Sequence, residues 1–204
     1  MSEAHLTTRR NLLDHTFYRR WVAGDLSTDE LRYYACQYAH VVSALPEWLR
    51  RAAAATPAHA AELNRHAAEE DSHVALWHRF SYALGITGSE LAATAPNAAT
   101  AALLERGEEL SGQPAGVAVA WALEVQTPAV SAEKLAGLRA HYGIQRESGG
   151  EYFDLHGSLD LVHAAALDEV IAGLDEDQFS VAQQTADTIL DGLWDLLTSA
   201  ERAA

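Results

Sequence analysis

A helical segment at residues 149–172 contains the sequence His156-Gly-Ser-Leu-Asp160-Leu-Val-His163. Offsets of four and three residues put both imidazoles and the carboxylate on one face of a single helix. Apolar neighbours such as Phe153 indicate that this face points inward, although a solvated polar stripe is the alternative. Two imidazoles and a carboxylate that converge from one face suit Fe(II), Mn(II) or Zn(II).

An upstream segment repeats this spacing with His66, Glu70 and His73. Offsets of four and three again place the three side chains on one helix face. Glu69 and other acidic neighbours flank them, so a charged surface helix is the competing interpretation. Alone, this segment does not decide between the two.

A third helix adds Glu124, at the end of the apolar run Val117-Ala-Val-Ala-Trp-Ala-Leu-Glu124. A carboxylate in such a run is costly to bury unless it is paired or binds a cation. Lys134, ten residues further on, is either a partner or a surface charge. Three helices that each offer His or carboxylate ligands are typical of helical bundles that hold two metal ions.

The rest of the chain predicts one all-α domain over residues 1–204, with seven helices. Few prolines, abundant alanine and helical apolar spacing support this fold class, and no alternating strand pattern competes. Pro46 and Pro128 are expected to kink their helices, and residues 86–98 to form a loop. The helices are expected from Leu12 to Gly24, from the Ser27 cap to Thr56-Pro57, over roughly 58–84, near 99–110, from Ala115 to His141, from Gly150 through Ala172 and from Asp175 to Ala200.

Composition excludes several functional classes. The chain has 14 Lys and Arg against 29 Asp and Glu, a formal net charge of −15, which argues against binding to nucleic acid or anionic membranes. A single cysteine, Cys36, excludes an internal disulfide framework and a four-thiolate metal site. No apolar run is long enough to span a bilayer and no secretory signal is recognisable, so a cytoplasmic protein is expected.

Several motifs together resemble the heme-oxygenase-like iron-containing redox enzymes, and in particular the branch of the chlamydial death-domain-associating protein (CADD). The resemblance covers nearly the whole chain. Its motifs are His15-Thr-Phe-Tyr18-Arg-Arg-Trp21, Tyr34-Ala-Cys-Gln-Tyr38-Ala-His40, His73-Val-Ala-Leu-Trp77, Glu124-Val-Gln-Thr-Pro-Ala-Val, Lys134-Leu-Ala-Gly-Leu, His141-Tyr-Gly and Tyr152-Phe-Asp-Leu-His156 with Asp160 and His163.

The resemblance implies a seven-helix heme-oxygenase-like bundle without heme, which holds a non-heme dimetal centre that activates O2. The positions that match family ligands are His73, Glu124, His156, Asp160 and His163. The ligand from the upstream helix is open: His66 stands where the CADD-like branch has a glutamate, and Glu70 matches the spacing of the alkene-forming fatty-acid decarboxylase branch. We expect Glu70 to be the ligand, with His66 as a rival or an outer residue.

The main expected function is that of an iron-containing oxygenase or oxidase that acts with O2 on a small organic molecule in a biosynthetic pathway. Its metal centre is expected to be diiron or iron/manganese. An external electron donor is a further expected partner, and whether the chain forms a homodimer is left open. Pocket lining is expected from Tyr34, Tyr38, His40, Trp77 and Tyr152.

Three alternatives stay open beside this function. The CADD branch implies a self-sacrificing synthesis of para-aminobenzoate from the enzyme's own tyrosine, with a lysine as amino donor. Tyr18, Tyr34, Tyr152 and Lys134 stand at the matching positions, but Leu123 replaces the aromatic residue of that branch. The second alternative is a metal-free enzyme, like the pyrroloquinoline-quinone synthesis oxidase or the thiaminase-like proteins, with Cys36 as candidate nucleophile. The third is a non-catalytic bundle that binds partners.

Overall fold

The computed structural model describes residues 5–201, and these form helices and loops without any β-strand. The α-helices are α1 (Thr16–Ala23), α2 (Thr28–Ala55), α3 (Ala60–Ala83), α4 (Gly88–Ala93), α5 (Ala98–Ser111), α6 (Val117–Glu124), α7 (Thr127–His141), α8 (Glu151–Ala172) and α9 (Glu176–Glu201). Short 3₁₀ turns are η1 (Leu12–Asp14), η2 (Pro57–His59) and η3 (Arg146–Ser148).

The all-α prediction is confirmed, but the predicted number of seven helices is wrong. The expected helix from Ala115 to His141 is divided into α6 and α7, and Pro128 lies in the first turn of α7. Proline is tolerated in a first turn because the N–H that it lacks has no partner within the helix there. The expected loop 86–98 contains α4, which Thr87 and Glu90 begin with a capping box.

Other helix boundaries follow the local signals. Ser27 and Glu30 form a capping box at the start of α2, and Gly24 ends α1 in the left-handed region with φ 76°. α2 continues through Pro46 to Ala55. These caps satisfy backbone groups that have no partner within the helix.

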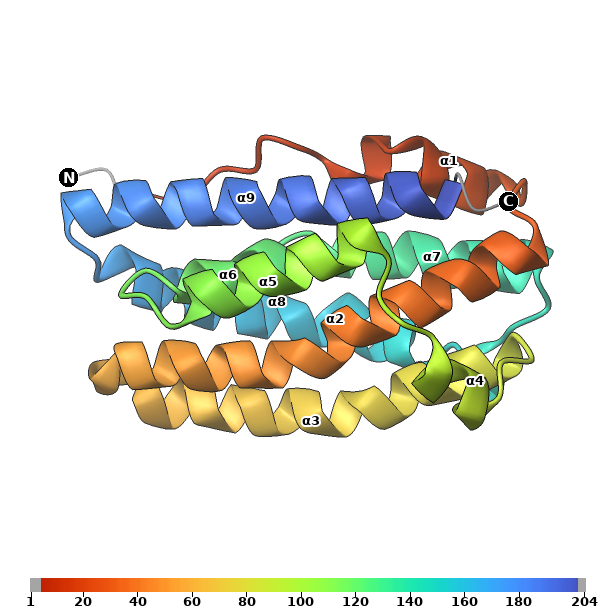
Figure 1. The fold of residues 1–204 in the computed structure, drawn as a ribbon, viewed down its shortest axis with the longest axis horizontal. Coiled ribbons are helices and arrows are strands. Elements are labelled where there is room, and N and C mark those ends of the chain that lie inside the picture. Colours follow the sequence, from red (N-terminus) through yellow and green to blue (C-terminus); the bar gives the residue numbers. More distant parts are fainter. Residues whose placement is uncertain (1–4, 202–204) are drawn as a thin grey trace.

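α6 occupies the centre of the bundle, with all eight of its residues buried. Around it, α2 and α3 lie side by side along one side of the molecule and α9 along the other (Figure 1). α2 and α3 run antiparallel, since Trp77 near the end of α3 donates a hydrogen bond to the carbonyl of Ala35 near the start of α2. α8 packs against α3, α6 and α7. Glu124, at the end of the short helix α6, therefore lies between the long helices α3 and α8.

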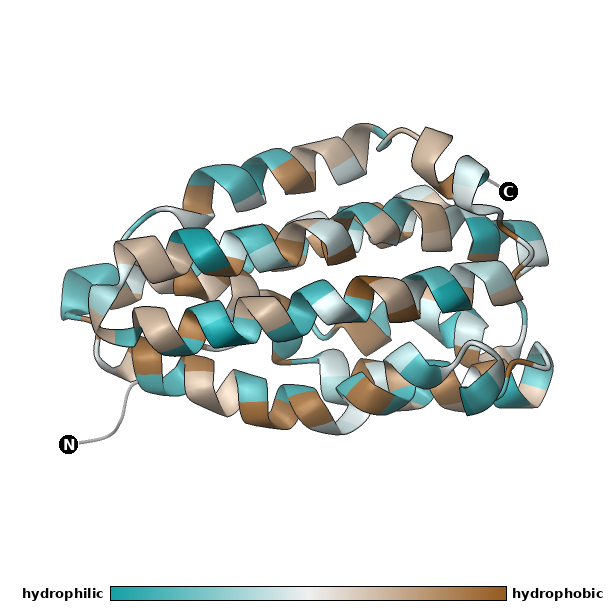
Figure 2. Ribbon diagram, turned by 90° about the horizontal axis from the view of Figure 1, so that it is seen from below, coloured by the Kyte–Doolittle hydropathy of each residue, from teal (hydrophilic) through white to brown (hydrophobic). Residues whose placement is uncertain are grey.

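The long helices carry both apolar and polar residues around their surfaces (Figure 2). The apolar residues face the shared core, which includes Trp21, Trp77 and Phe153. Within residues 5–201, no helix combines the length and the continuous apolar composition needed to cross a membrane.

The segment before α1 lies along α9 (Figure 1). Thr7 and Gln183 exchange backbone and side-chain hydrogen bonds, and Arg10 pairs with Asp191. The amide of Gln126 donates to the carbonyl of Arg10 and accepts from the N–H of Leu12. These contacts fix Leu12 over the core next to the start of α7.

Candidate metal centre and tyrosine–lysine cavity

Seven side chains with metal-ligating atoms meet in the core between three helices. Each is at most 6 % exposed, so the carboxylates and imidazoles face one another and not solvent. They are His66, Glu70 and His73 from α3, Glu124 from α6, and His156, Asp160 and His163 from α8. The predicted inward faces of the three helices are therefore the faces that meet.

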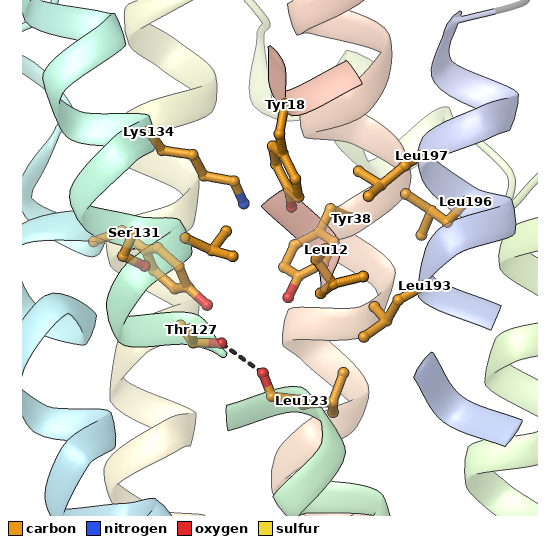
Figure 3. Close-up of a pocket in the computed structure, with 12 residues that line it drawn as sticks. Leu12, Tyr18, Tyr38, Leu123, Thr127, Ser131, Lys134, Leu193, Leu196 and Leu197 are labelled. Atoms are coloured by element: carbon orange, nitrogen blue, oxygen red, sulfur yellow. Dashed lines mark hydrogen bonds between the residues drawn. The ribbon is translucent and has the colours of Figure 1, made fainter. Parts of the chain in front are cut away.

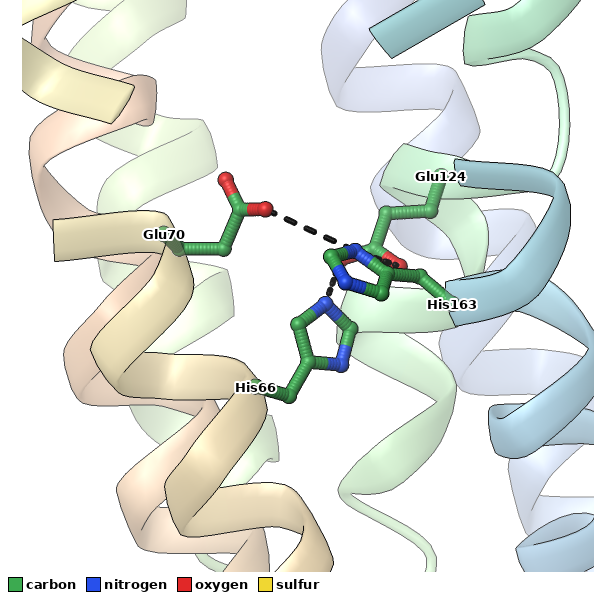
Figure 4. Close-up of side chains that lie close together, drawn as sticks. All are labelled: His66, Glu70, Glu124 and His163. Atoms are coloured by element: carbon green, nitrogen blue, oxygen red, sulfur yellow. Dashed lines mark ion pairs between the residues drawn. The ribbon is translucent and has the colours of Figure 1, made fainter. Parts of the chain in front are cut away.

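The first cluster consists of His66, Glu70, Glu124 and His163, whose ligand atoms all lie within 4.8 Å of one another. His66 Nε2 lies 2.9 Å from Glu124 Oε1, and His163 Nδ1 lies 3.6 Å from Glu70 Oε1. Figure 4 shows the four side chains converging from α3, α6 and α8. The sequence leaves open whether His66 or Glu70 is the ligand from this helix, and the structure places both side chains in the first cluster.

The second cluster consists of Glu70, His73 and His156 and shares Glu70 with the first. His73 Nδ1 lies 3.1 Å from Glu70 Oε1. Asp160 lies beside both clusters, with Oδ1 2.8 Å from His156 Nδ1 and 3.8 Å from His163 Nδ1. Carboxylates and histidines that face one another from several helices are the donor set of bundles that hold two metal ions, and here Glu70 would be within reach of both ions.

Burial and neighbouring charges shift the pKa values of this region. Burial raises the pKa of Glu124 well above the ordinary value, and the nearby carboxylates of Asp160 and Glu70 raise that pKa further. It also raises the pKa of Asp160, against the hydrogen bond from His156. Burial, together with the neighbouring His163, lowers the pKa of His66 to about 4. The hydrogen bond with His73 and the nearby imidazoles instead lower the pKa of Glu70, against its burial. The region therefore disfavours the charged forms of Glu124 and Asp160 unless a cation is present.

Several polar atoms of the clusters have no hydrogen-bond partner; His66 Nε2 and Glu124 Oε1 are 2.9 Å apart but are not aligned as a hydrogen bond. These atoms are Nε2 of His66, both carboxylate oxygens of Glu124, Nε2 of His156 and Nδ1 of His163. Buried polar atoms in proteins are rarely left without a partner. All five are lone-pair donors to metals, so a pair of divalent ions fits the residues present.

A cavity beside the clusters is lined by Lys134 and three tyrosines, and Figure 3 shows Lys134 with Tyr18 and Tyr38 around it. We call it the tyrosine–lysine cavity; its lining is Leu12, Tyr18, Tyr38, Leu123, Thr127, Val130, Ser131, Lys134, Tyr152, Leu193, Leu196 and Leu197. Tyr38, Leu123, Thr127 and Tyr152 also line a second hollow, together with Glu70, Glu124, His156 and Asp160. The cavity therefore adjoins the clusters.

Lys134 is buried among aromatic rings. Its Nζ donates a hydrogen bond of 2.6 Å to the hydroxyl of Tyr34 and lies 5.0 Å from the ring centre of Tyr18 and 5.2 Å from that of Tyr38. Burial lowers the pKa of Lys134 to about 7, and it raises the pKa of Tyr18, Tyr34 and Tyr38. At neutral pH a large share of Lys134 is therefore a neutral amine beside neutral phenols.

Comparison with known families matches residues 32–198 to the iron-containing redox enzymes. The chain belongs to this family. Two curated relatives are named 4-aminobenzoate synthase. The protein from Chlamydia trachomatis is 31 % identical over 91 % of this chain and 86 % of its own length. The protein from Nitrosomonas europaea is 31 % identical over 92 % of this chain and 85 % of its own length.

Solved structures share the fold. A protein from Shewanella denitrificans, described as having a heme-oxygenase-like fold, aligns with a TM-score of 0.78 at 14 % identity over 94 % of this chain and 86 % of that one. A CADD-like protein of unknown function from Nostoc punctiforme aligns with a TM-score of 0.75 at 18 % identity, over 95 % and 90 % of the two chains. The predicted heme-oxygenase-like fold and CADD-like resemblance are confirmed.

Two candidate residues lie away from the site. His40 does not line the tyrosine–lysine cavity; its ring Nε2 lies 3.0 Å from the carbonyl of Thr94, in a surface groove with His78. Burial raises the pKa of the Cys36 thiol, and the surroundings of this thiol do not activate it as a nucleophile. Trp77 is buried in contact with Tyr38 and Tyr152.

Sequence reasoning missed other residues at the site. Glu69 appeared only as a flanking charge, yet its Oε2 lies 2.9 Å from His163 Nε2. Leu12 and the leucines of α9 close the cavity from the two ends of the chain. No local signal marks them, because ordinary core leucines have the same pattern.

Proposed function

We propose that this protein is a 4-aminobenzoate synthase that builds its product from one of its own tyrosines and the nitrogen of Lys134, at a non-heme dimetal centre that uses O2. One observation carries the proposal: the amine of Lys134 lies among tyrosine rings in a cavity that adjoins the two ligand clusters. The names of two relatives, each 31 % identical to this chain, support the same activity.

The first and second clusters would hold the two ions. His66, Glu124 and His163 would ligate one ion, His73, His156 and Asp160 the other, and Glu70 would lie between them. Three carboxylates offset most of the charge of two divalent cations. Imidazole and carboxylate donors suit Fe(II) and Mn(II), and when bound the ions supply the redox chemistry with O2.

The tyrosine side chain contains the carbon skeleton of 4-aminobenzoate. Its aromatic ring carries Cβ on one side and the hydroxyl on the opposite side, where the product carries a carboxyl group and an amino group. Conversion therefore needs cleavage between Cα and Cβ and oxidation of Cβ to a carboxyl group, with O2 as the oxidant. It also needs the hydroxyl to leave as water while the ring bonds to the nitrogen of Lys134, and the Cε–Nζ bond of that lysine to break. The neutral amine of Lys134 has the lone pair that bonding to the ring requires, because burial lowers the pKa of Lys134 to about 7.

Tyr18 is the candidate that we favour as ring donor. It lines the tyrosine–lysine cavity with Lys134, so the excised ring would be released into an existing space. Tyr34 does not line the cavity, and its hydroxyl accepts the hydrogen bond from Lys134. Its role in this proposal is to hold the amine against the ring of Tyr18. Leucines of α9 and η1 keep bulk water from the same space.

A second candidate is the broader function, an oxygenase or oxidase of a separate small organic molecule with an external electron donor. The cavity beside the clusters supports it, because an added substrate would occupy the same space. Product analysis separates the two candidates. The metal-free alternative is less well supported, since it leaves five partnerless ligand atoms on four buried residues unexplained.

The test uses full-length protein with ring-¹³C tyrosine and ε-¹⁵N lysine, loaded anaerobically with Fe(II) and Mn(II) and then mixed with O2 and a chemical reductant. We expect 4-aminobenzoate that carries both labels, at no more than about one molecule per chain, and a peptide containing position 18 that has lost one tyrosine side chain. Tyr18→Phe and Lys134→Met should abolish the product, whereas Tyr33→Phe, outside the cavity, should not. Unlabelled product, or none from protein with both ions bound, would overturn the proposal.

A further inference from the structure

His163 differs from His73 and His156 in where one of its ring nitrogens points. Its Nε2 lies 2.9 Å from Oε2 of Glu69, a side chain that is 43 % exposed. In contrast, His73 and His156 each place Nδ1 against a buried carboxylate, of Glu70 and Asp160 respectively. Only His163, of these three histidines, is held from outside the clusters.

The contact with Glu69 determines which nitrogen of His163 carries hydrogen. A carboxylate oxygen has only lone pairs to offer, so Nε2 must donate the N–H to Glu69. In the neutral ring, Nδ1 then carries the lone pair. Nδ1 lies 3.6 Å from Glu70 Oε1 and 3.9 Å from Glu124 Oε2, too far for a hydrogen bond, and it has no hydrogen-bond partner.

This geometry leaves a nitrogen lone pair facing buried carboxylates. The arrangement is repulsive when nothing lies between the atoms, and it becomes favourable when a cation accepts electrons from all of them. The ring of His66 packs against that of His163 with 3.7 Å between centroids, which restricts rotation of the His163 ring. The orientation is therefore set by Glu69 on one side and by His66 on the other.

We propose that Glu69 is a positioning residue: it holds His163 in the tautomer with hydrogen on Nε2, so that Nδ1 is presented to the metal ion of the first cluster. The proposal rests on the dimetal centre of the proposed function. It assigns to a half-exposed residue of α3 a role in metal binding that acts through His163 and not as a ligand. Outer partners of this kind commonly raise the basicity and fix the ring angle of a ligating histidine.

The chain offers a matched control for Glu69. Glu62 lies seven residues earlier on α3 and pairs with the same arginine, Arg65, at 3.7 Å, as Glu69 does at 3.9 Å. The carboxylate that contacts His163 is that of Glu69, so Glu62→Ala removes a carboxylate and an ion pair with Arg65 from the same helix without removing the contact to His163. Glu69→Gln keeps an oxygen that accepts the N–H but removes the charge.

The test has two readouts at a single neutral pH. The ring ¹⁵N shifts of His163 in metal-free protein, assigned by comparison with His163→Gln, report which nitrogen carries hydrogen. Titration with Fe(II) or Mn(II) under anaerobic conditions reports the affinity for each of the two ions. Circular dichroism establishes that all variants keep the helical fold.

We expect wild-type protein and Glu62→Ala to show hydrogen on Nε2, and Glu69→Ala to show a mixture of tautomers. We expect Glu69→Ala to bind one of the two ions roughly 10- to 100-fold more weakly, with Glu69→Gln between the two. An unchanged tautomer, or an affinity within two-fold of wild type, would overturn the role of Glu69. Failure of the proposed function has a different signature: wild-type protein would bind both ions and show the expected tautomer but form no 4-aminobenzoate.

Discussion

Lys134 on α7 donates a hydrogen bond of 2.6 Å to the hydroxyl of Tyr34 on α2, 100 positions away in the sequence. The contact joins a basic group to a phenol where both are buried. It places the amine next to Tyr18 and Tyr38. Burial of this amine costs stability, because the amine must stay neutral or be desolvated as a cation.

The first prediction concerns this cost. Burial lowers the pKa of Lys134 from 10.5 to about 7, so between these values the unfolded chain binds a proton that the folded chain does not. Stability must therefore rise with pH in that window, by about 3 kcal/mol between pH 7 and pH 9.5. Urea denaturation of metal-free wild-type protein and Lys134→Met measures it.

We expect the difference in unfolding free energy between these two proteins to shrink or reverse over the same range. Measurements stay below pH 10, because the buried tyrosines have raised pKa values and remove stability above it. A constant difference from pH 7 to 9.5 would contradict the lowered pKa of Lys134.

The second prediction concerns His66, which stands where the CADD-like branch has a glutamate. Its Nε2 lies 2.9 Å from Glu124 Oε1 in the first cluster, so His66→Ala should lower the metal content by about one ion per chain while the second cluster keeps its own. His156→Ala should instead lose the ion of the second cluster. Elemental analysis and circular dichroism after anaerobic loading measure both effects.

His78 provides the control for these variants, since it lies on α3 with His66 but in a surface groove. His78→Ala should retain two ions. Full metal content in His66→Ala would mean that His66 is not a ligand.

The third prediction concerns Glu124. Its pKa is raised well above 4.5 by burial and by Asp160 and Glu70, so its favourable contribution to metal-free stability is present below pH 4.5 and is lost as pH rises through the raised pKa. At pH 7.5, Glu124→Gln should therefore stabilise the metal-free protein, by about 1–3 kcal/mol, and bind metal more weakly. Thermal unfolding with and without Mn(II) measures both effects.

Binding to the folded state alone raises stability by mass action. Mn(II) should therefore raise the melting temperature of wild-type protein more than that of Glu124→Gln. An equal rise in the two proteins would exclude Glu124 as a ligand.

The fourth prediction tests packing away from the site. A Cβ atom at Gly107 of α5 would lie 2.3 Å from Cζ2 of Trp48, whereas one at Gly112 would meet nothing within 4 Å. Gly107→Ala should cost about 1–3 kcal/mol by overpacking, and Gly112→Ala should leave stability nearly unchanged. Chemical denaturation compares the two, and equal stabilities would show that Trp48 moves aside freely.

The sequence by itself determined the helical class and the ligand-bearing faces of three helices. Offsets of four and three residues put His66, Glu70 and His73 on one face of α3, because the helical period depends only on local geometry. Local caps also fixed boundaries such as Ser27. The same local rules missed the break near Pro128, since proline either kinks a helix or begins one.

Only the tertiary structure decided which of these faces meet and what lies between them. It brought both His66 and Glu70 to Glu124 and left His40 in a surface groove. It also set Glu69 against His163, 94 positions away. Such pairs depend on how helices far apart in sequence pack, and a side chain that is charged and half-exposed looks the same in the sequence whether or not it contacts a buried histidine.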